Sequence, residues 1–341
     1  MNLGTIDIGT NTTLLLVAQV DAGGAVTVLD ERAEITRLGR GIGNVSGSGS
    51  PGKLGDEGIE ATLAALRTYA AIAQQHHATI AAIGTEGLRR AANADDFLRP
   101  AAAILGQPIE VIGGDREAAL TFRATLESFP AEAAAGWLAV VDIGGGSTEI
   151  VLAHKNDVRF HTSLPLGSVR LTERYIHHDP VQSDERKTIE DEIGAALAPV
   201  PFPPIQSGTL EGFPNPPATD SARGKPALRP RETLTLVGVA GTVTTFAAMA
   251  MQMSSYDATR VHGFALTADA LDEQLLRLGR STQAQRERMV GLDPRRADVI
   301  FAGGLILRGI AQRADVAALR VSDRGIRWGL LFEMRDAARR A

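Results

Sequence analysis

The chain of 341 residues contains no cysteine. This absence excludes disulfide bonds, thiolate chemistry and cysteine-ligated zinc. Lysine is also scarce, because the 35 basic residues include only Lys53, Lys155, Lys187 and Lys225. The other basic side chains are arginines, which favour planar, bidentate contacts with anions over the point charge of a lysine.

An excess of positive charge and a long hydrophobic run are missing as well. The formal net charge of −5 excludes a chain-wide cationic surface, so we expect neither nucleic acid nor a membrane as a partner. The apolar runs at residues 14–18 and 137–141 are far shorter than the roughly 20 residues that cross a bilayer. The first residues show no signal-peptide pattern, and we expect a soluble, cytoplasmic protein.

An internal repeat is the most informative feature of the sequence. Residues 7–17 (DIGTNTTLLLV) are echoed by residues 142–152 (DIGGGSTEIVL). Each copy places an aspartate at the end of an apolar strand, then a turn rich in glycine and hydroxyl side chains, then a second β-rich run. The repeat predicts two related halves, each presenting one such turn.

The rest of the chain alternates strand and helix patterns, which predicts an α/β fold in both halves. Strands are expected at residues 26–36, 79–84, 109–112, 157–164, 233–238 and 316–321. Helices are expected at residues 56–75, 94–104, 114–128, 168–176, 183–197, 242–252, 268–278, 295–312 and from 324 onward.

Breaks in these patterns indicate a domain boundary and two irregular stretches. Pro130 marks the boundary, because proline cannot continue a helix. Residues 41–55 are rich in glycine and residues 199–230 in proline, so neither stretch is expected inside a regular element. We interpret the second as a surface insertion, and a proline-rich ligand for a partner protein is the alternative.

Both turns of the repeat suit the binding of phosphate. Three consecutive glycines in the second turn let backbone N–H groups converge on an anion without steric hindrance, and hydroxyl and amide side chains add donors in the first. The aspartates that precede the turns, Asp7 and Asp142, are able to hold a metal ion or its water. The residues of the two turns are Gly9, Thr10, Asn11, Thr12, Gly144, Gly145, Gly146 and Ser147.

A third glycine turn, at residues 238–245, joins a strand to a helix whose N–H groups are available to an anion. Gly241 and Thr242 are its candidate phosphate contacts, and the alternative is that Thr242 is an ordinary helix N-cap. Residues 47–54 fit the P-loop spacing, but Leu54 stands where Mg²⁺ needs a hydroxyl, so we reject this motif.

Two segments with charged side chains follow predicted strands, where α/β folds place ligands. Residues 86–90 follow the strand at 79–84, and Glu117 opens the helix after the strand at 109–112. For Glu117, complementation of the helix dipole is the alternative interpretation. Residues 177–179 (HHD) suggest a metal site, but adjacent side chains project in different directions, so a polar helix end is favoured.

Six segments stand in an order that resembles one known family, the exopolyphosphatases and guanosine pentaphosphate phosphohydrolases. They are residues 7–17, 84–89, 109–118, 142–152, 238–245 and 321–327. The resemblance implies the actin-like, sugar-kinase-like fold, with two ribonuclease-H-like α/β domains around a central cleft. We expect the first domain at residues 1–128, completed by a C-terminal helix within 322–341, and the second at 129–321, including the insertion at 199–230.

The resemblance also implies an activity and a set of roles. The expected reaction is hydrolysis of the terminal phosphoanhydride of inorganic polyphosphate, or of guanosine pentaphosphate, with Mg²⁺ or alternatively Mn²⁺ as cofactor. By resemblance, Glu117 is the catalytic base that orients the attacking water, and a homodimer is compatible with the family. The metal-associated acids implied are Asp7, Asp142 and Glu149. The phosphate ligands implied are Gly9, Thr10, Asn11, Thr12, Arg89, Gly144, Gly145, Gly146, Ser147, Gly241 and Thr242.

The sequence departs from the family pattern at the first turn. Leu14 stands where many relatives carry an arginine, so one anion contact is missing or is replaced by Arg37, Arg40 or Arg90. Two other classes of function stay open, because a fold does not determine a function. One is an ATP-dependent small-molecule kinase, which needs a base facing an acceptor; the other is a non-catalytic sensor, which tolerates the loss of Glu117.

Overall fold

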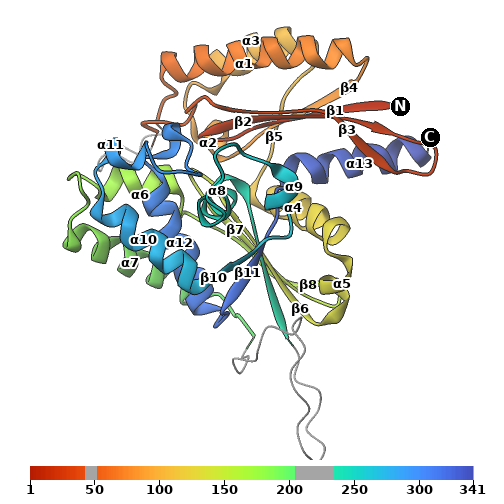
Figure 1. The fold of residues 1–341 in the computed structure, drawn as a ribbon. Helices are drawn as coiled ribbons and strands as arrows, with labels where there is room; N and C mark the ends of the chain where they lie inside the picture. The colour runs from red at the N-terminus through yellow and green to blue at the C-terminus, as the bar shows by residue number, and fades with distance from the viewer. Residues whose placement is uncertain (43–51, 204–232, 341) are drawn as a thin grey trace, which may run out of the picture.

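A computed structural model describes residues 1–42, 52–203 and 233–340. Its strands form two sheets, and its helices pack against them (Figure 1). Most of the predicted insertion at residues 199–230, and most of the P-loop-like segment at 47–54, lies outside the described residues. No helix within the described ranges is long and apolar enough to span a bilayer.

The first sheet has the strand order β3-β2-β1-β4-β5. Its strands are β1 (Asn2–Ile8), β2 (Thr12–Val20), β3 (Val26–Ile35), β4 (Thr79–Gly84) and β5 (Glu110–Val111). The strands β1, β2 and β3 pair antiparallel, whereas β4 lies parallel to β1, and β5 parallel to β4. Side chains alternate between the two faces, so Leu15 and Val17 join one core and Leu16 and Ala18 another.

The second sheet repeats this order, with one strand added at its edge: β10-β11-β9-β6-β7-β8. Its strands are β6 (Trp137–Ile143), β7 (Thr148–His154), β8 (Asp157–Leu164), β9 (Leu234–Val239), β10 (Ala265–Thr267) and β11 (Ala318–Val321). Here β6, β7 and β8 pair antiparallel, and β9 and β11 continue the sheet in parallel. The predicted fold class, two ribonuclease-H-like α/β units around a cleft, is confirmed.

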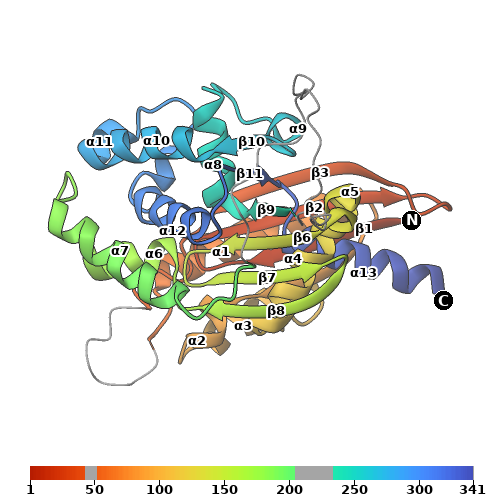
Figure 2. The same cartoon turned by 90° about the horizontal axis from the view of Figure 1, so that it is seen from below.

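Helices cover both faces of each sheet (Figures 1 and 2). They are α1 (Asp56–Gln75), α2 (Glu86–Arg90), α3 (Ala94–Leu105), α4 (Gly114–Ser128), α5 (Pro130–Ala135), α6 (Ser168–Tyr175), α7 (Ser183–Leu197), α8 (Ala240–Ala250), α9 (Ala258–Val261), α10 (Ala268–Arg280), α11 (Gln283–Arg286), α12 (Ile300–Arg313) and α13 (Ile326–Arg340). The main core lies between the second sheet and the layer of α6, α7, α8, α10 and α12.

Two helices, α4 and α13, connect the halves. Although α4 precedes the second sheet in the chain, it packs on that sheet through Ala118 and Phe122. Conversely, α13 follows the second sheet and packs on β1 and β2 through Trp328, Leu331 and Phe332. The two helices also contact each other, so they join the halves (Figure 1).

The structure differs from the predicted elements where a local capping interaction determines the residue at which a helix begins. The helix expected from residue 295 is wrong in its start, because Pro294–Arg296 form a separate 3-10 turn capped by Asp293 and α12 begins only at Ile300. The helix α4 ends at Ser128, as predicted, but Pro130 also begins α5, at a position where the missing N–H of proline has no partner to lose. The short elements β10, α9 and α11 had no periodic signal.

Candidate active site

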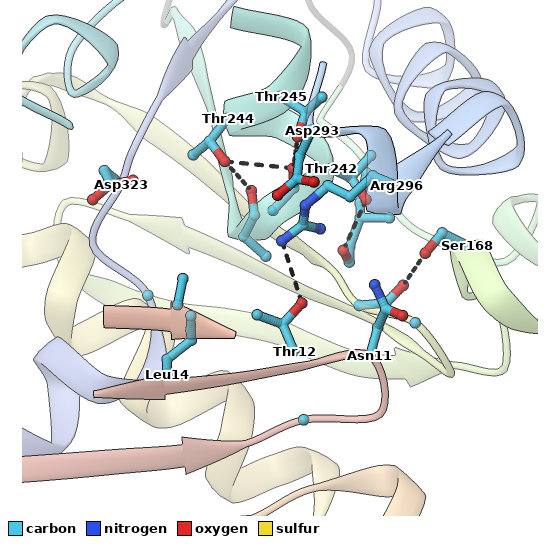
Figure 3. A pocket seen from close by; sticks show the side chains of 18 of the residues that line it. Asn11, Thr12, Leu14, Ser168, Thr242, Thr244, Thr245, Asp293, Arg296 and Asp323 are labelled. Atoms are coloured by element: carbon cyan, nitrogen blue, oxygen red, sulfur yellow. Dashed lines mark hydrogen bonds between the residues drawn. The ribbon is translucent and has the colours of Figure 1, made fainter. Parts of the chain in front are cut away.

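A cavity of about 910 Å³ lies between the two halves (Figure 3). The turns of both repeat copies line it, together with the segment after β9 and the first turn of α4. Of the predicted site residues, those that line the cavity are Asp7, Gly9, Thr10, Asn11, Thr12, Glu117, Asp142, Gly144, Gly145, Gly146, Ser147, Glu149, Gly241 and Thr242. Arg89 is the predicted contact that does not line it.

The two repeat copies form the same turn. Gly9 N donates to the carbonyl of Thr12 at 3.0 Å, and Gly144 N donates to that of Ser147, also at 3.0 Å. Across each hairpin, Asp7 pairs with Leu14 and Asp142 with Glu149. Leu14 and Glu149 therefore occupy equivalent positions, which gives the second half a carboxylate where the first half has an apolar side chain.

The turns meet face to face, and their glycines permit this close approach. A Cβ atom added at Gly145 would lie 3.2 Å from Cβ of Thr10. A Cβ at Gly146 would lie 1.6 Å from Oε2 of Glu86, which no side chain tolerates. Backbone N–H groups of both turns are thus brought to one cleft, as anion binding requires.

Besides Glu86, four carboxylates that are at most 9% exposed gather beside the turns: Asp7, Glu117, Asp142 and Glu149. Burial, reinforced by the charges of Asp142 and Glu117, raises the pKa of Asp7 to about 7. Burial likewise raises the pKa of Asp142 to about 7 and that of Glu149 to about 8, with Glu117 adding repulsion at both. In the absence of a cation these groups oppose one another's ionisation.

Glu117 stands in the first turn of α4 with Arg89 as its partner. Nη1 of Arg89 donates to Oε1 of Glu117 at 2.8 Å and to the carbonyl of Ile112 at 2.5 Å. Burial raises the pKa of Glu117, while the hydrogen bond and the charge of Arg89 act in the opposite direction. Arg89 therefore orients the carboxylate, a contact different from the phosphate contact that the resemblance implied.

The carboxylates suit a divalent cation whose coordination shell is completed by the substrate. Oδ1 of Asp7 is buried without a hydrogen-bond partner, while Asp142 and Glu149 are steadied by hydroxyls of Thr121 (3.2 Å) and Ser163 (2.7 Å). Among the described residues, no three acidic or histidine side chains converge closely enough to hold a metal by themselves. Mg²⁺ commonly takes one or two carboxylates, with phosphate oxygens and water as its other ligands, so this donor set suits it.

The third glycine segment lines the cavity at the start of α8. This helix begins at Ala240 with Val239 as its N-cap, so the alternative of Thr242 as the N-cap is wrong. Oγ1 of Thr242 instead donates to the carbonyl of Ile143 at 3.3 Å, which ties α8 to β6. Ala240 has φ of +68°, a strained conformation of the kind that collects at functional sites.

Arg296 is a cavity residue that the sequence analysis missed. Its Nη2 donates to Oγ1 of Thr12 at 3.2 Å, and its guanidinium packs against Gly241, so it touches both halves (Figure 3). Burial lowers its pKa, and within the described residues it forms no ion pair. Its neighbour Arg295, by contrast, is paired with Asp293. The signal was the cluster of glycine, proline and arginine at 291–296, which the predicted helix start at 295 concealed.

None of the arginines suggested as replacements at Leu14 lines the cavity. Arg37 pairs with Asp298 at 3.1 Å, Arg90 pairs with Glu86 at 3.2 Å, and Arg40 is exposed. Arg296 reaches the first turn with its guanidinium, whereas Arg37 contacts it only through the backbone, its amide donating to the carbonyl of Asn11 at 3.0 Å.

The histidine segment is a polar connection between helices, as favoured from the sequence. Oε1 of Glu185, in the first turn of α7, accepts from the amide of His177 and lies 2.9 Å from Nδ1 of His178. Asp179 accepts from the amide of Gln283. The three side chains do not converge on a metal.

Known proteins are similar to this chain over nearly its whole length. The sequence model of the Ppx/GppA phosphatase family matches residues 16–338. The protein named exopolyphosphatase 2 from Mycobacterium tuberculosis is 33% identical over 349 aligned residues, covering 97% of this chain and 98% of the relative. Exopolyphosphatase 1 from Mycobacterium bovis is 27% identical and covers 99% of this chain.

Solved structures give the same result. The crystal structure of the Aquifex aeolicus member of the Ppx/GppA family has a TM-score of 0.75 and 30% sequence identity, covering 99% of this chain and 98% of that one. An exopolyphosphatase from Cytophaga hutchinsonii has a TM-score of 0.82 at 24% identity and 98% coverage of its chain, a likeness of fold.

Proposed function

Because the chain belongs to the Ppx/GppA phosphatase family, we propose that it hydrolyses the terminal phosphoanhydride bond of inorganic polyphosphate and releases orthophosphate. The observation that carries the proposal is the position of Glu117, a buried carboxylate held by Arg89 in the same cavity as two glycine turns. A base beside converging N–H donors is what an in-line attack of water on phosphate requires.

In this proposal the turns bind the terminal phosphate and Arg296 binds a phosphate further along the chain. Glu117 accepts a proton from water while the new oxygen–phosphorus bond forms, and the bridging oxygen–phosphorus bond breaks. The shortened polyphosphate leaves with the bridging oxygen. The raised pKa of Glu117 supports this role, because a general base works best when its pKa approaches the working pH.

Asp142, Glu149 and Asp7 are the residues proposed to hold Mg²⁺, with Mn²⁺ as an alternative. When bound, the cation neutralises phosphate charge in the transition state. Its presence also explains why four carboxylates that raise one another's pKa are kept together in a cavity for an anionic substrate.

Guanosine pentaphosphate is a second candidate substrate, favoured by the side chains that line part of the cavity. Beyond the phosphate turns the cavity continues to apolar and aromatic side chains, with Met253, Tyr256 and Leu292 among its lining residues. Such a lining suits the flat apolar face of a nucleoside. Inorganic polyphosphate has no group that uses this end.

One experiment separates these proposals from the kinase and sensor alternatives. The protein is incubated with polyphosphate, guanosine pentaphosphate or ATP, each with and without Mg²⁺, and orthophosphate release, substrate binding and the consumption of ATP with and without an added acceptor are followed. Mg²⁺-dependent release from polyphosphate supports the main proposal. Consumption of ATP only with an added acceptor indicates a kinase, and binding without turnover indicates a sensor.

A further inference from the structure

The glycine turn of the second half rests on the start of α6. Three backbone N–H groups of this helix donate to the turn: that of Ser168 to the carbonyl of Gly144 at 3.0 Å, and those of Val169 and Arg170 to the carbonyl of Gly145 at 2.9 and 3.1 Å. The carbonyl of Gly146 accepts instead from a side chain, Nε of Arg170, at 2.7 Å. All three carbonyls are therefore bound on the α6 side. The amide of Gly144 is bound within the turn by the carbonyl of Ser147, so the amides of Gly145 and Gly146 are the ones left for the cleft.

The guanidinium of Arg170 also reaches the other half of the molecule. Its Nη2 donates to Oε1 of Glu86, the first residue of α2, in a short hydrogen bond. Glu86 is 7% exposed, and the same oxygen accepts from Arg90 at 3.2 Å. Arg170 thus binds a backbone carbonyl of its own half and a carboxylate of the opposite half at once.

Glu86 presses directly on the turn that Arg170 holds. Its second oxygen, Oε2, occupies the space that a side chain at position 146 would need. Two arginines face this single carboxylate, so the group carries a net positive charge although one of its members is acidic. The negative charge of Glu86, taken by itself, would repel a polyanion.

A run of glycines needs such a restraint. Glycine populates many backbone conformations, and a rotation of one peptide unit replaces an N–H group in the cleft by a carbonyl, which repels phosphate. For the peptide that follows Gly146, the fixed carbonyl partner is the guanidinium of Arg170. Glu86 in turn limits the orientations that Arg170 can take.

We propose that Arg170 and Glu86 form a clamp, here called the Arg170–Glu86 clamp, whose two members are positioning residues for the second phosphate turn. Arg170 orients the peptide of Gly146, and Glu86 fixes Arg170 when the two halves are in contact. This inference rests on the proposed function, because its effect is on the binding and cleavage of phosphate chains.

The variant Glu86→Gln tests the clamp, because the clamp and a simple charge effect predict opposite changes in the binding of a polyanion. If Glu86 acted only through its charge, removing that charge would tighten the binding of a polyanion. The clamp has the opposite consequence, because the amide loses the ion pair with Arg170 and the turn loses its restraint. We expect the KM for tripolyphosphate to rise by about tenfold, the lower end of the effect of groups that orient a site's direct ligands.

Arg170→Gln and the double variant complete the test. Arg170→Gln is expected to raise KM by a similar factor, and Arg170→Lys, which keeps the charge and one donor, by less. The double variant Glu86→Gln/Arg170→Gln is expected to be no worse than the poorer single variant, because the two side chains act as one unit. Arg174→Gln is the matched control, since Arg174 lies one turn further on α6, is exposed and pairs with Glu192 at 3.4 Å.

The measurements are initial rates of phosphate release at fixed free Mg²⁺, tripolyphosphate binding by calorimetry, and thermal midpoints. A KM for Glu86→Gln at or below that of the wild type, with a normal midpoint, overturns the clamp, as does a double variant whose loss is the product of the single losses. If Glu86→Gln or Arg170→Gln unfolds, the test uses Arg170→Lys instead. Tripolyphosphate binding by Arg170→Lys that is as tight as that of the wild type then overturns the clamp. A wild type that neither cleaves nor binds polyphosphate refutes the proposed function itself, and the clamp with it.

Discussion

Replacing Arg296 by glutamine is expected to weaken substrate binding without weakening the fold. Arg296 contacts Thr12 and Gly241 but forms no ion pair within the described residues, and burial lowers its pKa. Burial therefore disfavours this charge in the free protein, the nearby charge of Asp293 offsets only part of the effect, and a polyphosphate oxygen is a partner that offsets more of it. A hydrogen bond to a charged group is worth about 1.5–3 kcal/mol, which corresponds to a rise in KM of about 10- to 150-fold.

The assay is the initial rate of phosphate release as a function of tripolyphosphate concentration, at fixed free Mg²⁺ and ionic strength. Arg295→Gln is the matched control, because Arg295 is the next residue in the chain, half exposed and paired with Asp293 and Glu34. The control should leave KM unchanged, and the thermal midpoint of Arg296→Gln should equal or exceed that of the wild type. A KM within about twofold of the wild type would refute the reasoning, since a lost charged hydrogen bond costs more than that.

Three further predictions follow from the cavity. Gly146→Ala should abolish phosphate release while Gly113→Ala, where a Cβ meets nothing within 4 Å, should not; rates and thermal midpoints of both variants check this. The stability of the metal-free protein should fall as the pH rises from near 3.8 to about 8, because in this range the folded state binds extra protons at Asp7 and Glu149. Thermal midpoints measured across this pH range test the prediction, and a midpoint that rises with pH contradicts it. Asp142→Ala and Glu149→Ala should each raise the Mg²⁺ concentration needed for half-maximal activity; unshifted Mg²⁺ titrations would show that substrate alone carries the metal.

The fold was predictable because its determinants are local. The hairpins of the repeat combine an apolar period of two with glycine at the turn, and both signals lie within about ten residues of chain. The same locality explains the correct bounds of α1, α4 and α7. Short elements such as β10 and α9 depend on tertiary contacts, so no periodic signal was available for them.

The candidate site was predictable where a residue sits in a turn of the repeat, and not where it arrives from a distant segment. Arg296 reaches Thr12 across 284 positions of the sequence, and Arg170 reaches Glu86 across 84. Such contacts are decided by how the halves pack. Arg89 shows the intermediate case, because the motif located it near the site but only the structure shows its hydrogen bond to Glu117.

The central claim, that Glu117 is the base of a polyphosphate hydrolase, is tested most directly by Glu117→Gln. The amide keeps the size of the side chain and an oxygen for the hydrogen bond of Arg89, but it loses the capacity to accept a proton from water and the charge that pairs with Arg89. Asp115→Asn is the control, because Asp115 lies on the same helical turn and is 89% exposed. Phosphate release by Glu117→Gln should fall by about 100-fold or more, while tripolyphosphate binding stays within a few-fold. Turnover above about a tenth of the wild-type rate would contradict the account, because a base that contributes so little is not the catalytic one.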